Sequence, residues 1–340
     1  MDFEALTGIT PTDDERQLLQ LYSRCTLCPN RCAVDRLAGV TGLCASTAVP
    51  LISFCGLHRG EEPPVSGKKG AGMVFFNGCS LHCRYCQNSQ ISLSGTDSPG
   101  VPTDIPTLVS LMLALQEQGA HCLNLVTSSH FLPTVIIALK RARRQGLKLP
   151  VVYNTSGFET VEALRLIDPL VDLYLIDVKT LDKSVATAFC GGSAYPDVIV
   201  PAMEYLRSTH PRTFMRKGHL YGILVRHLVF PGTLEATMSF LDWYAAGYKY
   251  RCYLSLMVQF VPPDGDKTLP ELTREQYDRL MNRLDELEID DGFYQEYGED
   301  AGFEAERMWI PDFNRDQPFA PGFADPLPLF LNLRKNSRRN

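Results

Sequence analysis

Residues 72–93, GMVFFNGCSLHCRYCQNSQISL, combine an apolar run with three closely spaced cysteines. The run at 72–76 is typical of a short buried strand, and Cys79, Cys83 and Cys86 follow it with C-x3-C-x2-C spacing. Three thiolates in one tight loop can hold three corners of a cubane iron–sulfur cluster, which takes four cysteines when the protein holds it fully. No fourth cysteine follows closely, so one iron would stay open to an outside ligand, as in catalytic metal sites. A zinc loop or a chance grouping is the alternative.

Strand-like and helical runs alternate from residue 72 onward. Strands are predicted at about 72–77, 122–127, 150–155, 172–178, 222–229 and 253–259, and helices at 104–118, 134–145, 159–167 and 234–246. Such alternation indicates βαβ units and a parallel sheet. Six units suit an open, partial (β/α)6 barrel of the TIM type, in which chemistry lies at the C-terminal ends of the strands. A doubly wound sheet is the alternative, but it would need a Gly-rich phosphate turn where the cysteine loop stands.

Three regions are expected along the chain. Residues 1–66 form a Cys-rich N-terminal lobe, residues 67–262 the barrel core, and residues 263–340 a C-terminal covering extension with one helix near 273–287. A further helical pattern covers residues 14–24. The basic run at 334–339 is predicted to be a frayed, solvated tail, with a docking element for an acidic partner as the alternative.

Composition narrows the class of protein. The chain has 340 residues, of which 45% are hydrophobic and 21% charged, as in a globular protein. No apolar run is long enough for a membrane span, and the acidic N-terminus lacks a signal-peptide core, so we expect a cytoplasmic protein without membrane contact. Eleven cysteines in a reducing compartment indicate metal ligands or buried thiols rather than disulfides. A net charge of −6 argues against a nucleic-acid partner.

A second cysteine group precedes the first strand. Cys25, Cys28, Cys32 and Cys44 have C-x2-C-x3-C-x11-C spacing in a segment rich in turn residues. Four thiolates can close the shell of a structural zinc ion or of an auxiliary iron–sulfur cluster, and free buried thiols are the remaining alternative. The isolated cysteines are predicted to be small core residues; these are Cys55, Cys122, Cys190 and Cys252.

Several segments together resemble the radical S-adenosylmethionine (SAM) superfamily, and within it the activating enzymes of glycyl-radical enzymes such as pyruvate formate-lyase. The resembling segments are residues 61–92, 153–160, 173–182, 224–233 and 254–260. The resemblance implies a 4Fe-4S cluster whose open iron chelates SAM. One electron from the reduced cluster then yields methionine and a 5′-deoxyadenosyl radical that abstracts hydrogen. It also implies an electron donor such as flavodoxin or ferredoxin.

The resemblance leaves the substrate open. One interpretation is a protein substrate, a backbone glycine of a glycyl-radical enzyme, and another is a small molecule or peptide modified by the same radical. A different class would be a non-catalytic metal-binding module, in which both cysteine groups are structural.

The resemblance also implies residues that contact SAM. Tyr85 would lie against adenine, and Asn154 stands where the family has an acidic residue in a turn near the SAM carboxylate. Asp177 and Lys179 match an Asp-x-Lys pattern whose lysine pairs with that carboxylate. Alternation along a strand sends both to one face, and a salt bridge within the barrel is the alternative. Arg226 falls on a family arginine, whose forked donors suit carboxylates.

One turn departs from the superfamily pattern. Residues 126–130, VTSSH, replace the Gly-Gly-Glu-like turn that usually receives the SAM amino group. Thr127 and Ser129 offer hydroxyl acceptors there without a carboxylate. His130 is expected at the mouth of the barrel as a candidate substrate contact, with solvent exposure or a capping role as the alternative.

Overall fold

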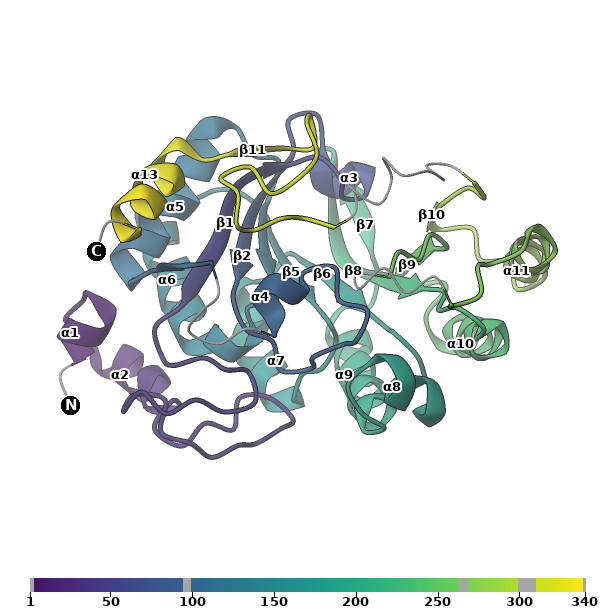
Figure 1. Cartoon of the computed structure of the whole chain (residues 1–340), viewed down its shortest axis with the longest axis horizontal. Coiled ribbons are helices and arrows are strands. Elements are labelled where there is room, and N and C mark those ends of the chain that lie inside the picture. The colour runs from purple at the N-terminus through teal and green to yellow at the C-terminus, as the bar shows by residue number, and fades with distance from the viewer. Residues whose placement is uncertain (1–2, 94–98, 263–267, 299–309, 339–340) are drawn as a thin grey trace.

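The computed structural model describes residues 3–93, 99–262, 268–298 and 310–338 and is built around one open sheet (Figure 1). Six strands lie side by side in chain order, and every neighbouring pair is parallel. They are β2 (Ala71–Phe76), β4 (Leu123–Val126), β5 (Val151–Thr155), β6 (Leu173–Asp177), β8 (His219–Leu228) and β9 (Tyr253–Met257). Each overlaps a predicted strand. The α/β fold with a partial parallel barrel is therefore confirmed.

Further strands pair with these six. β1 (Leu51–His58) pairs antiparallel with β2, and β3 (Val101–Pro102) and β11 (Ala324–Pro326) pair antiparallel with β1. At the other edge, β10 (Gly292–Tyr294) runs parallel to β9, while β7 (Phe214–Arg216) forms an antiparallel hairpin with the inner strand β8. Residues 51–58 were expected in the N-terminal lobe, and no strand was predicted there. The domain boundaries remain a prediction.

Helices cover the outer face of the sheet (Figure 1). They are α5 (Ile105–Gln118), α6 (Leu132–Arg144), α7 (Val161–Ile167), α8 (Lys183–Phe189), α9 (Tyr195–Thr209) and α10 (Leu234–Gly247). The N-cap side chains of Asp104 and Thr160 accept hydrogen bonds from backbone amides at the starts of α5 and α7, which satisfies donors that a helix leaves free. The helices predicted in these regions are confirmed, but α8 and α9 were not predicted.

The remaining helices lie outside this layer. They are α1 (Phe3–Thr7), α2 (Asp13–Gln20), α3 (Pro63–Ser66), α4 (Ser89–Ser92), α11 (Arg274–Glu286), α13 (Pro328–Ser337) and the 3-10 turns Ser129–Phe131 and Asp168–Leu170. α11 confirms the helix predicted near 273–287, and α2 ends earlier than the predicted 14–24. Within the described residues, no helix is both long and apolar enough to cross a lipid bilayer.

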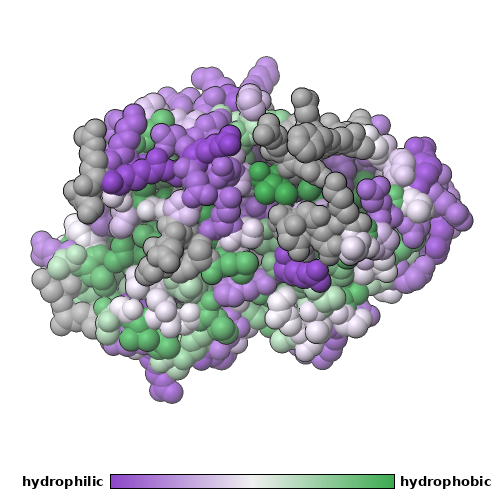
Figure 2. All heavy atoms as spheres, in the orientation of Figure 1, coloured by the Kyte–Doolittle hydropathy of each residue, from purple (hydrophilic) through white to green (hydrophobic). Residues whose placement is uncertain are grey.

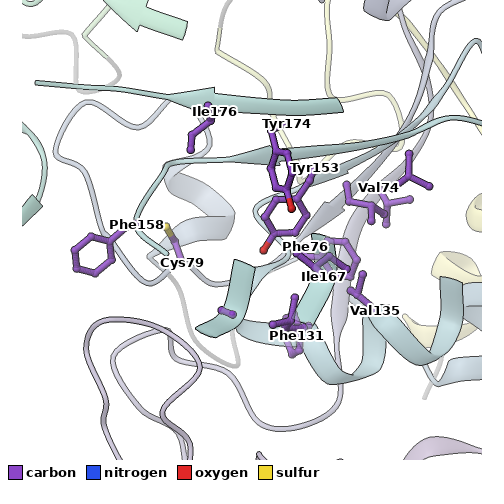
Figure 3. Close-up of a cluster of buried hydrophobic side chains, with 14 of the residues drawn as sticks. Val74, Phe76, Cys79, Phe131, Val135, Tyr153, Phe158, Ile167, Tyr174 and Ile176 are labelled. Carbon is purple, nitrogen blue, oxygen red and sulfur yellow. The ribbon is translucent and has the colours of Figure 1, made fainter. Parts of the chain in front are cut away.

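Two hydrophobic cores lie on opposite sides of the sheet. The larger core fills the space between the strands and the outer helices and includes Val74, Tyr153 and Tyr174 (Figure 3). The smaller core lines the concave face of the sheet and includes Val152, Leu175 and Leu224, and further aromatic side chains from the C-terminal segment. Because side chains alternate along a strand, residues two or four positions from the inner-core members also face the inside of the barrel.

The C-terminal helix corrects one prediction. Arg334, predicted to lie in a frayed tail, is only 5% exposed and belongs to α13. Its guanidinium donates to the carbonyl oxygens of Phe313 and Ser53, and α13 contacts β1, β3 and α5. The prediction was wrong because a basic run at the end of a chain does not reveal the carbonyl groups that its arginine reaches.

Candidate active site

The cysteine loop follows β2 directly, at the C-terminal end of the strand. Cys79 and Cys83 are buried and Cys86 is half-buried. The backbone amide of Gly78 donates to Ile91 O at 2.7 Å, and the amide of Arg84 donates to Phe189 O at 3.0 Å. The loop is therefore held at its start by α4, and between Cys83 and Cys86 by the end of α8.

The three thiols are close enough to influence one another. Burial, together with the neighbouring Cys83 and Cys86, raises the pKa of Cys79 to about 12. Burial also raises the pKa of Cys86, although Ser92 Oγ lies 3.4 Å from its sulfur. Bare thiols here hold their protons, and metal binding displaces such protons. In the described part of the chain, no three His, Cys, Asp or Glu side chains are arranged so that they could hold a metal ion as they stand.

Cys190 lies beside this loop. The Cys83 thiol donates a hydrogen bond to the Cys190 sulfur, which raises the pKa of Cys83 and lowers that of Cys190. The next residue, Gly191, has φ +77°, and a Cβ there would lie 2.1 Å from Leu81 O. The backbone of the loop thus rests directly on Gly191, and the sequence pattern, in which Cys190 is isolated, gave no sign of this.

Three predicted SAM contacts share the inner face of the barrel. Asn154, Asp177 and Arg226 lie two residues beyond the inner-core members of their own strands. Asp177 and Arg226 are also paired across β6 and β8. The structure therefore brings together side chains that are far apart in sequence, near the C-terminal ends of neighbouring strands.

Lys179 and Asp177 form a salt bridge in this group, with Nζ 2.8 Å from the carboxylate. Burial opposes the charge of Lys179, but Asp177, Tyr85 and Cys83 together hold its pKa well above the ordinary value. The Lys179 ammonium also lies 5.3 Å from the centre of the Tyr85 ring. A permanent positive charge thus stands beside the cysteine loop.

Tyr85 belongs to an aromatic cluster next to this charge. Its ring centre is 4.6 Å from that of Phe230 and 6.1 Å from that of Phe260, and Phe189 stacks on Phe230 at 4.8 Å. Offset and edge-to-face aromatic contacts of this kind stabilise a hydrophobic wall. The predicted adenine contact of Tyr85 stays a prediction, and the structure gives the ring packing partners of its own.

Arg226 is already engaged. Its guanidinium lies 2.6–2.7 Å from the carboxylates of Glu61 and Glu62, just before α3. Burial alone would raise the pKa of Glu61, but Arg226 and His58 lower it to about 2. Arg226 lies 164 and 165 residues from these partners in the chain, so no local sequence pattern predicts this buried cluster.

The turn after β4 is strained, and one of its hydroxyls is engaged. Thr127 has φ +54°, which is costly for a β-branched residue and typical of functional or tightly constrained sites. Ser129 donates to the buried carboxyl of Glu159, as does Thr155. Burial raises the pKa of Glu159 to about 7, although these hydroxyls oppose the shift. Glu159 lies in the resembling segment 153–160, but the sequence alone does not predict these partners.

The N-terminal cysteines lie together near the same loop. Cys25, Cys28, Cys32 and Cys44 line one enclosed cavity with His130. His130 is 1% exposed, so its predicted solvent-exposed alternative is wrong, and its Nε2 donates to Asn77 O at 2.7 Å. Its contact with substrate stays a prediction. The other isolated cysteines, Cys55, Cys122 and Cys252, are buried core residues as predicted.

Comparison with known proteins identifies the protein family of the central part of this chain. Residues 73–241 match the sequence model of the Radical SAM superfamily, from β2 through most of α10. The chain therefore contains a radical SAM superfamily domain, and this domain carries the cysteine loop.

The individual proteins that resemble this chain have low sequence identity to it. An uncharacterised protein of Methanocaldococcus jannaschii, MJ0674, is 23% identical over 282 residues, which cover 79% of this chain and 77% of that protein. Among solved structures, Streptococcus suis SuiB bound to S-adenosylmethionine has a TM-score of 0.46 at 10% identity, over 68% of this chain and 52% of SuiB. The chain thus spans about half the length of SuiB.

A domain of pyruvate-formate lyase-activating enzyme from Bacteroides vulgatus has a TM-score of 0.37 at 13% identity and covers 48% of this chain and 91% of that domain. Methylornithine synthase (PylB) has a TM-score of 0.44 at 12% identity, over 86% of this chain and 81% of PylB. All these TM-scores are below 0.5, so we draw no conclusion about this chain from them.

Proposed function

We propose that this protein is a radical SAM enzyme whose catalytic cluster is held by Cys79, Cys83 and Cys86. The main support is the position of the loop: three buried or half-buried thiols follow the first strand of a matched radical SAM domain, at the C-terminal end of a partial barrel. Catalytic groups of such barrels lie at that end. When bound, a reduced 4Fe-4S cluster would supply the electron that cleaves SAM into methionine and a 5′-deoxyadenosyl radical.

The donor set suits such a cluster. The described chain places three thiols in one loop, while the nearest additional thiol, Cys190, is hydrogen-bonded to Cys83. Cys190 belongs to a different segment, so ligation by the loop alone would leave one coordination position for the amino acid part of SAM. The amide of Leu81, 3.4 Å from Cys79 Sγ, would stabilise a thiolate there by a charge-assisted hydrogen bond.

Lys179 is the residue best placed to bind the SAM carboxylate. Its ammonium is held charged, is 11% exposed at the side chain, and lies on the inner face beside Tyr85. Asp177 keeps the lysine oriented. Asn154, on the same inner face, offers an amide to the ribose or carboxylate of SAM. Arg226 is less available, because two carboxylates already neutralise it.

In this proposal the aromatic cluster also keeps water away from the reaction. Tyr85, Phe189, Phe230 and Phe260 form an apolar wall beside the loop. Such a wall excludes water and keeps stray hydrogen donors away from a reactive radical. Tyr85 would contribute an aromatic face to adenine from this wall.

For the substrate, we propose a backbone glycine of a partner protein, a glycyl-radical enzyme. The support is the set of resembling segments from 61–92 to 254–260. The radical SAM enzyme itself needs a one-electron donor that reduces its cluster, and flavodoxin or ferredoxin is suited to this role. A small molecule or peptide that loses hydrogen to the same radical is the second candidate.

The test follows a deuterium label. The reconstituted protein, SAM and dithionite are incubated anaerobically with a glycyl-radical enzyme that carries α-deuterated glycine. Deuterium in 5′-deoxyadenosine together with a glycyl radical signal supports the glycine substrate. SAM cleavage could also occur without deuterium in 5′-deoxyadenosine and without a glycyl radical, for every glycyl-radical enzyme of the same genome. In that case the substrate is a small molecule or a peptide.

A further inference from the structure

We propose that Cys25, Cys28, Cys32 and Cys44 bind one zinc ion, and that this zinc site fastens the N-terminal segment onto the start of the catalytic loop. The first argument is placement. These four cysteines, spread over residues 25–44, all line a single enclosed cavity. Tetrahedral sets of four cysteines from short loops are the usual ligands of structural zinc.

A buried positive charge supplies the second argument. Arg36 is 1% exposed and lines the same cavity. Within the described ranges it forms no ion pair: its guanidinium donates to the carbonyl oxygens of Ser46, Thr47 and His130, and Nη1 lies 3.7 Å from Cys25 Sγ. A buried cation without a counter-charge is costly. Four thiolates around one divalent ion carry two net negative charges, which would provide the counter-charge for Arg36.

An unsatisfied ring nitrogen points to the same cavity. His130 Nε2 donates to Asn77 O, so Nδ1 carries a lone pair, and this buried Nδ1 has no partner among the described residues. His130 is one of the lining residues. Such orphaned buried polar atoms call for an unseen partner, so one group that lines this cavity is left unsatisfied by the described residues.

Cavity volume favours zinc over an auxiliary cluster. Both would carry a similar negative charge, so Arg36 does not distinguish them. The cavity has a volume of about 10 Å³, which is roughly the room that a single water-sized sphere needs. A cubane of four irons and four sulfides would need the four loops to move apart, whereas a single ion needs them only to close in.

Backbone amides around the sulfurs support thiolate ligands. The amide of Leu43 lies 3.5 Å from Cys32 Sγ, and the amide of Asn30 donates to Cys28. A Cβ at Gly42 would lie 2.9 Å from Cys32 Sγ, so the chain approaches this sulfur closely. Amide donors stabilise sulfur anions by charge-assisted hydrogen bonds.

Packing holds only part of this segment: Tyr22, Leu27 and Leu37 are buried in the larger core. Val40 and Leu43 are 49% and 58% exposed, and residues 21–50 contain no helix or strand. Figure 2 shows a hydrophobic area on the lower left of the molecule, where this segment lies in Figure 1. The turns around Val40 and Leu43 leave apolar side chains in water and lack regular secondary structure, so metal binding can contribute to their order.

The segment touches the catalytic loop at its beginning. Asn30 Nδ2 donates to Ser80 O at 2.6 Å, and His130, held by Arg36, donates to Asn77 O. Gly78 has φ +82°, and a Cβ there would lie 2.4 Å from Cys44 O. The zinc site would therefore hold the residues on both sides of Gly78 in the position that Cys79 needs.

The test measures the metal content of the whole chain after the cysteines of the catalytic loop have been replaced. In a variant with Cys79, Cys83 and Cys86 all changed to Ala, purified anaerobically, we expect one zinc ion per chain and no acid-labile sulfide. In that background Cys28→Ala or Cys44→Ala should abolish zinc binding, while Cys252→Ala, a matched buried cysteine elsewhere, should keep it. Iron with sulfide at this site, or no metal, would overturn the proposal.

A second measurement avoids substitutions that might prevent folding. The wild-type protein is treated with a zinc chelator and then with trypsin. Removal of zinc should increase cleavage after Arg31, whose side chain is 60% exposed, by at least tenfold, and added zinc should restore protection. Cleavage after Arg216, in the exposed strand β7, serves as the control and should not change. Equal cleavage after Arg31 with and without zinc contradicts the proposal, whatever the activity of the catalytic cluster.

Discussion

Replacing Arg226 with Met should destabilise the fold strongly rather than merely weaken SAM binding. The Arg226 side chain is 15% exposed, and it lies between the carboxylates of Glu61 and Glu62, which are 8% and 7% exposed. Methionine keeps the aliphatic stem but leaves two buried carboxylates facing each other. Removing one partner of a buried pair typically costs about 3–5 kcal/mol, and we expect the free energy of unfolding to fall by about that amount at pH 7.

The pH dependence provides an internal check. Arg226 and His58 hold the pKa of Glu61 at about 2, below its ordinary value of 4.5. A lowered carboxyl pKa stabilises the folded state above pH 4.5, and this stability is lost as pH falls from 4.5 through 2. The shift corresponds to about 3 kcal/mol. The difference between wild type and Arg226→Met should therefore shrink as the pH is lowered through this window.

Urea unfolding under anaerobic conditions, followed by circular dichroism, measures both effects. Arg279→Met is the matched control, because its ion pair with Glu235 is exposed at both side chains and such pairs contribute about 0–1 kcal/mol. The reasoning is refuted if Arg226→Met unfolds at the same urea concentration as wild type while its dissociation constant for SAM rises. Arg226 would then be a ligand contact, as the sequence resemblance implies.

Three further predictions concern single side chains. Lys179→Ala should weaken SAM binding by about 1–3 kcal/mol, because it removes a charged partner of the carboxylate; calorimetry on the cluster-loaded protein measures this, and the exposed Lys183→Ala should bind SAM as wild type does. Glu159→Gln should change how the free energy of unfolding depends on pH. The pKa of Glu159 is raised to about 7, so the stability of the wild type falls by about 3 kcal/mol between pH 4.5 and 7. If the variant shows the same fall, another group causes it. Arg334→Ala should cost about 1–3 kcal/mol, since two buried carbonyl oxygens lose their donor, and hydrogen exchange should rise across 310–338; unchanged exchange would mean that the C-terminal helix is held by its apolar side chains alone.

The sequence was sufficient for the barrel because its strands are buried and its helices amphipathic. Each of the six parallel strands is a short apolar run that ends near a polar residue, and that pattern predicts its position in the sequence. β1 was missed because residues 51–58 lie between the two cysteine groups and were assigned to the lobe. α9 was missed because Pro201 lies inside it, and proline normally argues against a helix interior.

The site could be predicted from the sequence only where its residues lie close together in the chain. Asp177 and Lys179 are two residues apart, so strand alternation places them together, and the structure shows their salt bridge. The partners of Arg226 and Arg36 come from distant segments or from backbone carbonyl groups, which no local pattern encodes. The contact between Cys83 and Cys190 likewise depends on how α8 ends above the loop.

The central claim is that the loop of Cys79, Cys83 and Cys86 supports reductive cleavage of SAM. The most direct measurement is 5′-deoxyadenosine formation by the anaerobically reconstituted protein with dithionite and SAM, compared with the variant in which all three cysteines are Ala. We expect stoichiometric or greater formation by the wild type and none above background by the variant, with Cys252→Ala behaving as wild type. Cleavage by the triple variant at the wild-type rate, or none by a wild-type protein with full iron and sulfide content, would contradict the assignment.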